Sequence, residues 1–126
     1  MKVILLTKKF NKNGERFVKK LNNSLNEVDI KVVYSLSDIF QYISINSLII
    51  FHVDSHNTLV DILLYREKFE WSKIIIILPD EDENTIAKGL LLKPRFISTN
   101  DHNINDILAV INNIISNEKS KKQNNK

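Results

Sequence analysis

The chain is expected to fold as a doubly wound α/β domain, with a five-stranded parallel sheet and helices on both faces. Five short apolar runs alternate with five segments of helical period, which is typical of parallel α/β sheets. The third and fourth runs, 47–53 and 73–78, are the most continuously apolar, as expected for central strands that helices cover on both sides. Right-handed crossovers between five such units favour the strand order 2-1-3-4-5.

The first two units have clear boundaries. A strand at residues 2–7 precedes a helix at 14–26, for which Asn11 or Asn13 can provide the N-terminal cap. The apolar stripe of this helix contains Phe17, Val18, Leu21 and Leu25. A second strand at 29–34 leads into a short helix, and Ser35-Leu36-Ser37-Asp38 has the form of a capping box. Its expected buried residues are Leu36, Ile39, Phe40 and Ile43.

The remaining units follow the same rhythm. The third strand precedes a helix at 57–70, whose apolar stripe contains Leu59, Ile62, Leu63, Val60 and Leu64. Phe69 and Trp71, near the end of this helix, are expected to pack in the core or at its edge. Asp80 or Asp82 can cap a fourth helix that runs to about residue 92, before Pro94. A fifth strand at 95–98 precedes a helix whose aliphatic face contains Ile104, Ile107, Leu108, Ile111, Ile114 and Ile115.

Charge and composition limit the function classes. Residues 1–117 form the expected domain and carry 14 Lys and Arg against 14 Asp and Glu, so the net charge of +3 lies in residues 118–126. This tail has no apolar residue and is expected to be a disordered basic end, so nucleic-acid binding is not predicted. The chain has no cysteine, and no apolar run approaches membrane-spanning length. A soluble cytoplasmic protein that does not bind membranes is therefore expected.

The carboxyl edge of the predicted sheet collects the candidate site residues. Thr7 and Lys8 follow the first strand, His52 ends the third, Asp54 comes two residues later, Pro79 follows the fourth, and Thr99 follows the fifth. Ligands of open α/β sheets bind at this edge.

The order and lengths of these elements over residues 1–117 resemble the receiver domain of bacterial two-component response regulators, which has a flavodoxin-like fold. The most specific stretch is 73–118: an apolar fourth strand, Pro79 and four acids, a helix holding Ala87, then Arg95-Phe96-Ile97-Ser98 and a long amphipathic helix. Phe96 falls where many receivers place a switch Tyr or Phe.

Active receivers need two acids after strand 1 for Mg²⁺, an acceptor Asp ending strand 3, a Thr or Ser ending strand 4 and a Lys ending strand 5. The cations neutralise charge on the transferred phosphoryl group. This chain has Thr7-Lys8, His52, Pro79 and Thr99 at those positions. The resemblance therefore implies a degenerate pseudo-receiver that is not an enzyme, has no cofactor and takes up no phosphoryl group.

Three alternatives at this edge remain open. Asp54 could act as a conventional phosphoacceptor, although it lacks a partner acid for Mg²⁺. His52, Asp54 and His56, with His102 from a later loop, could hold Zn²⁺ or Ni²⁺, but no metal site is predicted. Lys8, His52, Asp54 and Thr99 could form the crevice of a small-ligand or anion sensor. The acids Asp80-Glu81-Asp82-Glu83 are expected to stabilise the start of a helix.

The output of such a stand-alone signalling module is expected to be protein contact, with a homodimer as one possible form. In the resemblance, the contact face is built from the fourth helix, fifth strand and fifth helix. On this chain that face contains Ile86, Leu90, Leu91, Lys93, Arg95, Phe96 and Ile111. Leu90, Leu91 and Leu92 are adjacent in one helix and cannot all point inward, so at least one is expected to be exposed.

Overall fold

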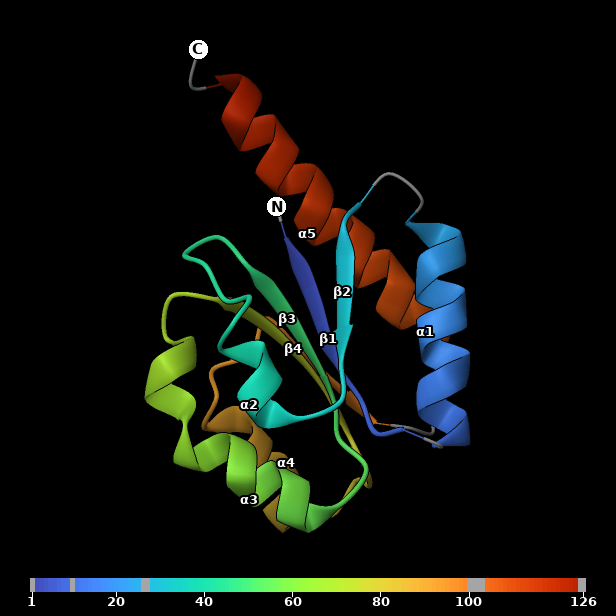
Figure 1. Cartoon of the computed structure of the whole chain (residues 1–126), viewed down its shortest axis with the longest axis vertical. Coiled ribbons are helices and arrows are strands. Elements are labelled where there is room, and N and C mark those ends of the chain that lie inside the picture. The colour runs from blue at the N-terminus through green and yellow to red at the C-terminus, as the bar shows by residue number, and fades with distance from the viewer. Residues whose placement is uncertain (1, 10, 26–27, 100–103, 125–126) are drawn as a thin grey trace.

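The five predicted strands form one parallel sheet in the predicted order. The computed structural model of the chain describes residues 2–9, 11–25, 28–99 and 104–124, with side chains up to residue 118. The strand order is β2-β1-β3-β4-β5, and every pair of neighbouring strands is parallel (Figure 1). The strands are β1 (Val3–Leu6), β2 (Ile30–Val33), β3 (Leu48–His52), β4 (Lys73–Leu78) and β5 (Phe96–Thr99). This is the flavodoxin-like α/β arrangement.

Helices cover both faces of this sheet. They are α1 (Lys12–Ser24), α2 (Leu36–Ile39), α3 (His56–Leu64), the short 3₁₀ helix η1 (Arg66–Phe69), α4 (Glu83–Leu90) and α5 (Ile104–Asn124). The apolar residues of α1 and α5 pack on one face of the sheet, and those of α2, α3, η1 and the segment that ends α4 pack on the other. None of the helices in the described ranges is both long and apolar enough to cross a lipid bilayer.

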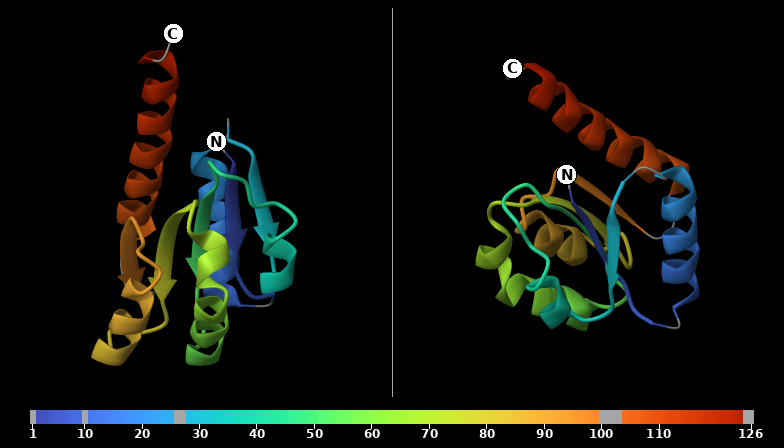
Figure 2. Two further views of the ribbon diagram at one scale, coloured as in Figure 1. Left: turned by 90° about the vertical axis from the view of Figure 1, so that its left-hand side faces the viewer. Right: turned by 45° about the horizontal axis from the view of Figure 1, so that its top comes forward.

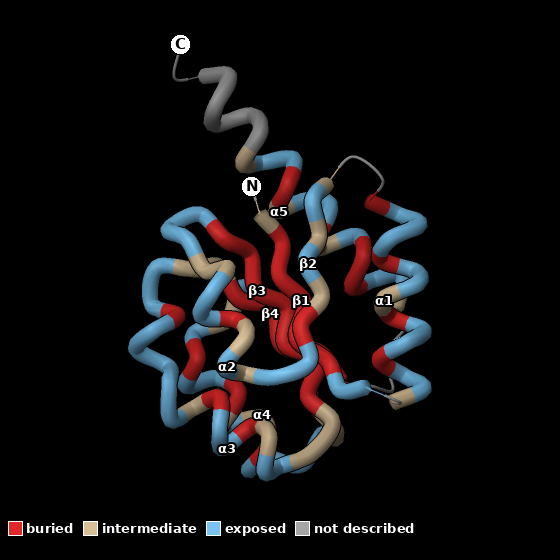
Figure 3. Tube along the Cα trace, viewed as in Figure 1, coloured by how far each residue is buried: buried red, intermediate tan, exposed pale blue. Residues whose placement is uncertain are grey.

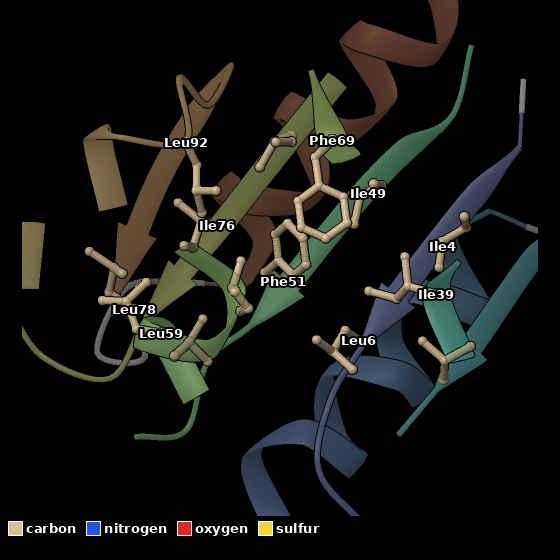
Figure 4. Packing of buried hydrophobic residues seen from close by; sticks show 14 residues of the cluster. Ile4, Leu6, Ile39, Ile49, Phe51, Leu59, Phe69, Ile76, Leu78 and Leu92 are labelled. Atoms are coloured by element: carbon tan, nitrogen blue, oxygen red, sulfur yellow. The ribbon is translucent and has the colours of Figure 1, made fainter. Parts of the chain in front are cut away.

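Strand side chains alternate between two core layers. In β3, Leu48 and Ile50 point to the layer beneath α1 and α5, whereas Ile49 and Phe51 point to the opposite layer. All five residues of β3 are buried, in agreement with its apolar sequence and central place (Figure 3). Figure 4 shows the second layer, in which the rings of Phe51 and Phe69 meet edge to face with their centroids 5.2 Å apart. Such aromatic pairs contribute about 0.5–1.5 kcal/mol beyond their buried area.

Two of the predicted helix caps are confirmed and one is wrong. The Asn11 side chain accepts a hydrogen bond from the Gly14 N–H at 2.9 Å, and the Asp82 side chain accepts one from the Asn84 N–H. Ser35 precedes α2, but its side chain makes no capping hydrogen bond and lies 3.2 Å from the Ser37 hydroxyl instead. A helix of four residues gives a capping box little to stabilise.

The third helix is shorter than predicted, and only part of its predicted apolar stripe is buried. The chain leaves the α-helix at Tyr65 and continues as η1. Leu59 and Ile62 are buried, whereas Val60 is 42% exposed and Leu64 is 74% exposed. Trp71 lies in the turn before β4 and is 76% exposed, so the prediction that it packs in the core or at its edge is wrong.

Helix α5 continues past residue 117, where a disordered tail was expected, and it remains helical to Asn124. Its far end extends beyond the sheet (Figures 1 and 2). Glu118 is the first residue of the expected tail, yet its carboxylate lies 2.6 Å from the ammonium of Lys73 at the start of β4. Both side chains are largely buried, at 23% exposure for Lys73 and 14% for Glu118. This ion pair fastens α5 to the sheet beyond the predicted boundary.

Candidate functional site

Polar residues from three strands converge at the carboxyl edge of the sheet, which lies toward the bottom of Figure 1. Thr7 follows β1 and is 3% exposed, His52 ends β3 and is 5% exposed, and Thr99 ends β5 and is 6% exposed. Pro79 follows β4 and is half-buried. With Lys8, which follows Thr7, five of the six predicted site residues therefore stand at one edge, and three of them are buried polar side chains.

Thr7 is buried against the first turn of α1. A Cβ atom on Gly14 would lie 2.2 Å from the Thr7 Oγ1, so helix and strand approach closely only because residue 14 has no side chain. The Thr7 hydroxyl has no hydrogen-bond partner among the described residues. Lys8, the next residue, is exposed.

Two hollows flank His52. The first, of about 180 Å³, lies between α1 and the start of α5 and is called here the α1–α5 hollow. Its polar lining consists of Asn13, Arg16, Lys20, His52 and Thr99. The second hollow, of about 220 Å³, lies on the opposite face of the sheet, and its polar lining includes Thr7, Lys8, Ser35, His52, Thr58 and Asp61.

The imidazole of His52 packs against an aromatic ring at the edge of the first hollow. Its ring centroid lies 5.8 Å from that of Phe17, with 35° between the ring planes. Phe17 belongs to the apolar face of α1, so the same residue closes the core and supports the histidine. The carboxyl end of β3 is therefore occupied by a buried imidazole that packs on an aromatic ring.

Asp54 is separate from this group and belongs to the start of α3. Its Oδ1 accepts a hydrogen bond from the Thr58 hydroxyl at 2.9 Å. The neighbouring Ser55 caps the same helix, because its hydroxyl accepts a hydrogen bond from the Thr58 N–H. Asp54 thus works as a helix-start residue, and neither hollow has it in its lining.

The histidine and aspartate side chains near β3 diverge. His52 contacts Phe17, Asp54 binds Thr58, and His56 binds Asp80 through a contact of 2.7 Å from Nε2 to Oδ2. Within the described ranges there is no group of three or more His, Cys, Asp or Glu residues that could hold a metal ion. His102 lies outside the described residues.

The pairing of His56 with Asp80 is a feature that the sequence analysis missed. The two residues follow neighbouring strands, β3 and β4, and the Thr85 hydroxyl also lies 3.2 Å from the His56 Nε2. The hydrogen bond from His56 lowers the pKa of the Asp80 carboxyl, and hydrogen bonds from Thr85 and the Asp82 N–H lower it further. The sequence did indicate that the two residues follow neighbouring strands. It could not show that their loops turn toward each other, because sequence spacing does not specify the direction of a loop.

Two of the acids at residues 80–83 act locally at the start of α4. The Asp80 Oδ1 accepts a hydrogen bond from the Asp82 N–H at 3.0 Å, and Asp82 caps the helix. Glu81 lies close to the edge group, because its Oε1 is 3.5 Å from the Thr99 hydroxyl that donates to it. This carboxylate stands beside Thr99 but does not line either hollow.

The predicted contact face is partly exposed. Leu90 and Leu91 are 55% and 57% exposed, whereas Leu92 is 6% exposed, so the expectation that these three adjacent leucines cannot all be buried is confirmed. Lys93 and Arg95 are exposed, and Ile86 and Phe96 are half-buried. Ile111 is fully buried beneath the sheet and belongs to no surface, because the aliphatic stripe of α5 faces inward at this position.

A hollow of about 340 Å³ lies beside these leucines, between η1 and the segment that ends α4. Leu91 and Lys93 line it from one side, and Glu70 and Ser72 line it from the other. The exposed Trp71 stands between the latter two in the chain. We call the exposed residues Leu90, Leu91 and Trp71 the apolar patch.

A comparison with protein-family models finds no match, and a search of curated proteins finds none either. The resemblance to receiver domains therefore remains a prediction.

Proposed function

We propose that the protein is a receiver-like signalling module that acts through protein contacts and does not depend on aspartyl phosphorylation. The resemblance of the chain to receivers would place it in the cytoplasm, in two-component signalling of bacteria. The observation that carries the proposal is the composition of the carboxyl edge, where Thr7, Lys8 and His52 stand in place of the acids that receivers use.

These side chains are unsuited to aspartyl phosphate chemistry. Mg²⁺ prefers oxygen ligands, carboxylates above all, in octahedral geometry, and an exposed ammonium at Lys8 repels it. A buried imidazole packed on Phe17 offers neither an acceptor carboxylate nor a ligand for this ion. Asp54 would have to give up its bond to Thr58, and a phosphoryl group there would lack a cation to neutralise it.

The apolar patch supports an output by contact. Its three large apolar side chains are each more than half exposed, and Leu91 lines the adjoining hollow. Exposed apolar surface of this kind is typical of interaction sites. We propose a second copy of the chain as the first partner to test, since symmetric homodimers are the commonest soluble oligomers. The basic side chains of Lys93 and Arg95 lie beside the leucines in the chain and would form part of the rim.

The phosphorylation part is tested by intact mass after incubation with a small phosphodonor and Mg²⁺. We expect no phosphoryl adduct, while a conventional receiver treated in parallel gains one. An adduct on the wild-type protein that is absent from Asp54→Asn would overturn this part of the proposal and assign Asp54 as the acceptor.

The contact part is tested by analytical ultracentrifugation over a range of protein concentrations. We expect the wild-type chain to self-associate and Leu91→Glu to remain monomeric, because a carboxylate cannot be buried unpaired in an interface. Ile45→Glu is the matched control, since Ile45 is 75% exposed and lies in the loop before β3. A monomeric wild type, or equal weakening by both variants, would count against the patch as a self-association surface.

A further inference from the structure

The α1–α5 hollow has an unusual charge for a site at the carboxyl edge of a receiver-like sheet. Its described polar lining contains Arg16 and Lys20 from α1 and the imidazole of His52, and no carboxylate. Neither Arg16 nor Lys20 forms an ion pair within the described ranges. Two permanent cations thus line one small space whose described lining contains no carboxylate.

Two helix starts reinforce this positive potential. Asn13 is the second residue of α1, and Ile104 is the first residue of α5, and both line the hollow. Each helix carries a partial positive charge at its N-terminus, equivalent to roughly half an elementary charge. The first turn of each helix also carries one acid, Glu15 in α1 and Asp106 in α5, but neither of these acids lines the hollow.

The inner wall of the hollow is built from buried groups. His52 and Thr99 are both more than nine-tenths buried, and Phe17 and Ile77 close the space between them. Interactions with a charged ligand are stronger there than at an open surface, because less water screens them. One carboxylate lies beside this wall, because Glu81 accepts a long hydrogen bond of 3.5 Å from the Thr99 hydroxyl.

We propose that the α1–α5 hollow binds a phosphate dianion, either as the free ion or as the phosphate group of a small monoester. The volume of about 180 Å³ corresponds to roughly six waters at about 30 Å³ each, which admits a tetrahedral phosphate with a few further atoms. An Arg guanidinium binds two phosphate oxygens at once, and an ammonium can hold a third. A planar monocarboxylate would leave one of these cations unmatched.

The ligand proposed here differs from that of active receiver domains. Their acidic pocket binds Mg²⁺ and takes up a covalent phosphoryl group, whereas this basic hollow would bind a phosphate anion without a metal and without a covalent step. The residues of the apolar patch belong to other elements. Phosphate binding in the α1–α5 hollow and self-association through the apolar patch can therefore fail independently of each other.

The test is a titration of the full chain with inorganic phosphate at constant ionic strength, with chloride as the balancing ion, followed by amide chemical shifts. We expect saturable shifts around α1 and the start of α5. Arg16→Gln and Lys20→Gln should each raise the dissociation constant for phosphate about tenfold, because each removes one charge-assisted hydrogen bond. Both side chains are exposed, so these variants should fold normally.

Lys19→Gln is the matched control, because it removes the same charge from the same helix, and Lys19 lines a different hollow. It should leave the affinity unchanged. A parallel titration with glycerol phosphate separates the two sources, since tighter binding of the monoester points to a metabolite and weaker binding to the free ion. No saturable binding of either probe up to about 10 mM, or equal weakening by Lys19→Gln, would overturn the proposal.

Discussion

Replacing Gly14 with alanine is expected to destabilise the protein, although alanine is the better helix former. Gly14 is the third residue of α1, and its backbone N–H donates to the Asn11 cap. The new methyl group would lie 2.2 Å from the Thr7 hydroxyl oxygen, which is far inside van der Waals contact. The next nearest atom, the Thr7 Cβ, would be 3.5 Å away, an ordinary contact, so one oxygen causes nearly all of the clash.

The size of the effect follows from two opposing terms. Overpacking at a buried position costs about 1–3 kcal/mol, and the helix preference for alanine over glycine returns up to about 1 kcal/mol. We therefore expect Gly14→Ala to lower the free energy of unfolding by up to about 2 kcal/mol. Thr7 is β-branched and buried, so turning its side chain away relieves the clash only by leaving its preferred rotamer.

The decisive comparison is the same substitution in a Thr7→Ala background. Without the hydroxyl oxygen the clash disappears, so Gly14→Ala should raise the free energy of unfolding by up to about 1 kcal/mol. The sign of one substitution thus reverses between two backgrounds, with a coupling energy of about 1–3 kcal/mol. Gly89→Ala is a useful contrast, since the three atoms nearest to its Cβ would be the side-chain ends of Ile97 and Leu78 at 3.0–3.3 Å.

Urea unfolding followed by far-UV circular dichroism measures these differences, with an unchanged m-value as the check on two-state behaviour. The fluorescence of Trp71 is a poor probe because this side chain is already exposed in the folded protein. Effects of Gly14→Ala that agree within about 0.5 kcal/mol in the two backgrounds would show that Thr7 and Gly14 are not in close contact.

Two further predictions concern ion pairs. Because hydrogen bonding from His56 holds the pKa of Asp80 below its ordinary value of 3.8, the stability this carboxylate contributes is present above about pH 3.8 and is lost as the pH falls below it. His56→Ala should move the pKa of Asp80 up toward that value in an NMR titration, and an unchanged pKa would mean that other contacts hold it. Glu118→Gln should lower the free energy of unfolding by about 1–2 kcal/mol. Most of this loss should be absent in a Lys73→Met background. If the two substitutions instead lower the free energy of unfolding additively, the ion pair between Lys73 and Glu118 is not formed in solution.

Most of the fold could be predicted from the sequence because its strands carry a strong and simple signal. β3 and β4 are apolar along almost their whole length and can only be central strands, so the strand order followed from general rules of connection. The errors concern the third helix, which was predicted to extend to residue 70 but ends at Leu64 before η1. Leu64 was placed on its apolar stripe and Trp71 near its end, and both are exposed.

The site could be predicted only in part. Thr7, His52 and Thr99 were found because residues that end parallel strands must share one edge of the sheet. Arg16 and Lys20 were missed, since their arrival at this edge depends on how α1 crosses the sheet, which sequence spacing does not specify. For the same reason Asp54 was grouped with His52, although a turn after β3 directs it to α3.

The backbone conformation of Lys93 determines how the chain leaves the end of α4. Its φ of +52° places a residue with a side chain in the left-handed region, at a cost of about 1–2 kcal/mol. Its N–H nevertheless donates to the Leu90 carbonyl at 3.0 Å, and Pro94 follows with a fixed φ, so the backbone leaves the helix along one defined path. The exposed Leu90 therefore supplies, through its carbonyl, the hydrogen bond that closes this turn, so the backbone that carries the apolar patch also ends the helix.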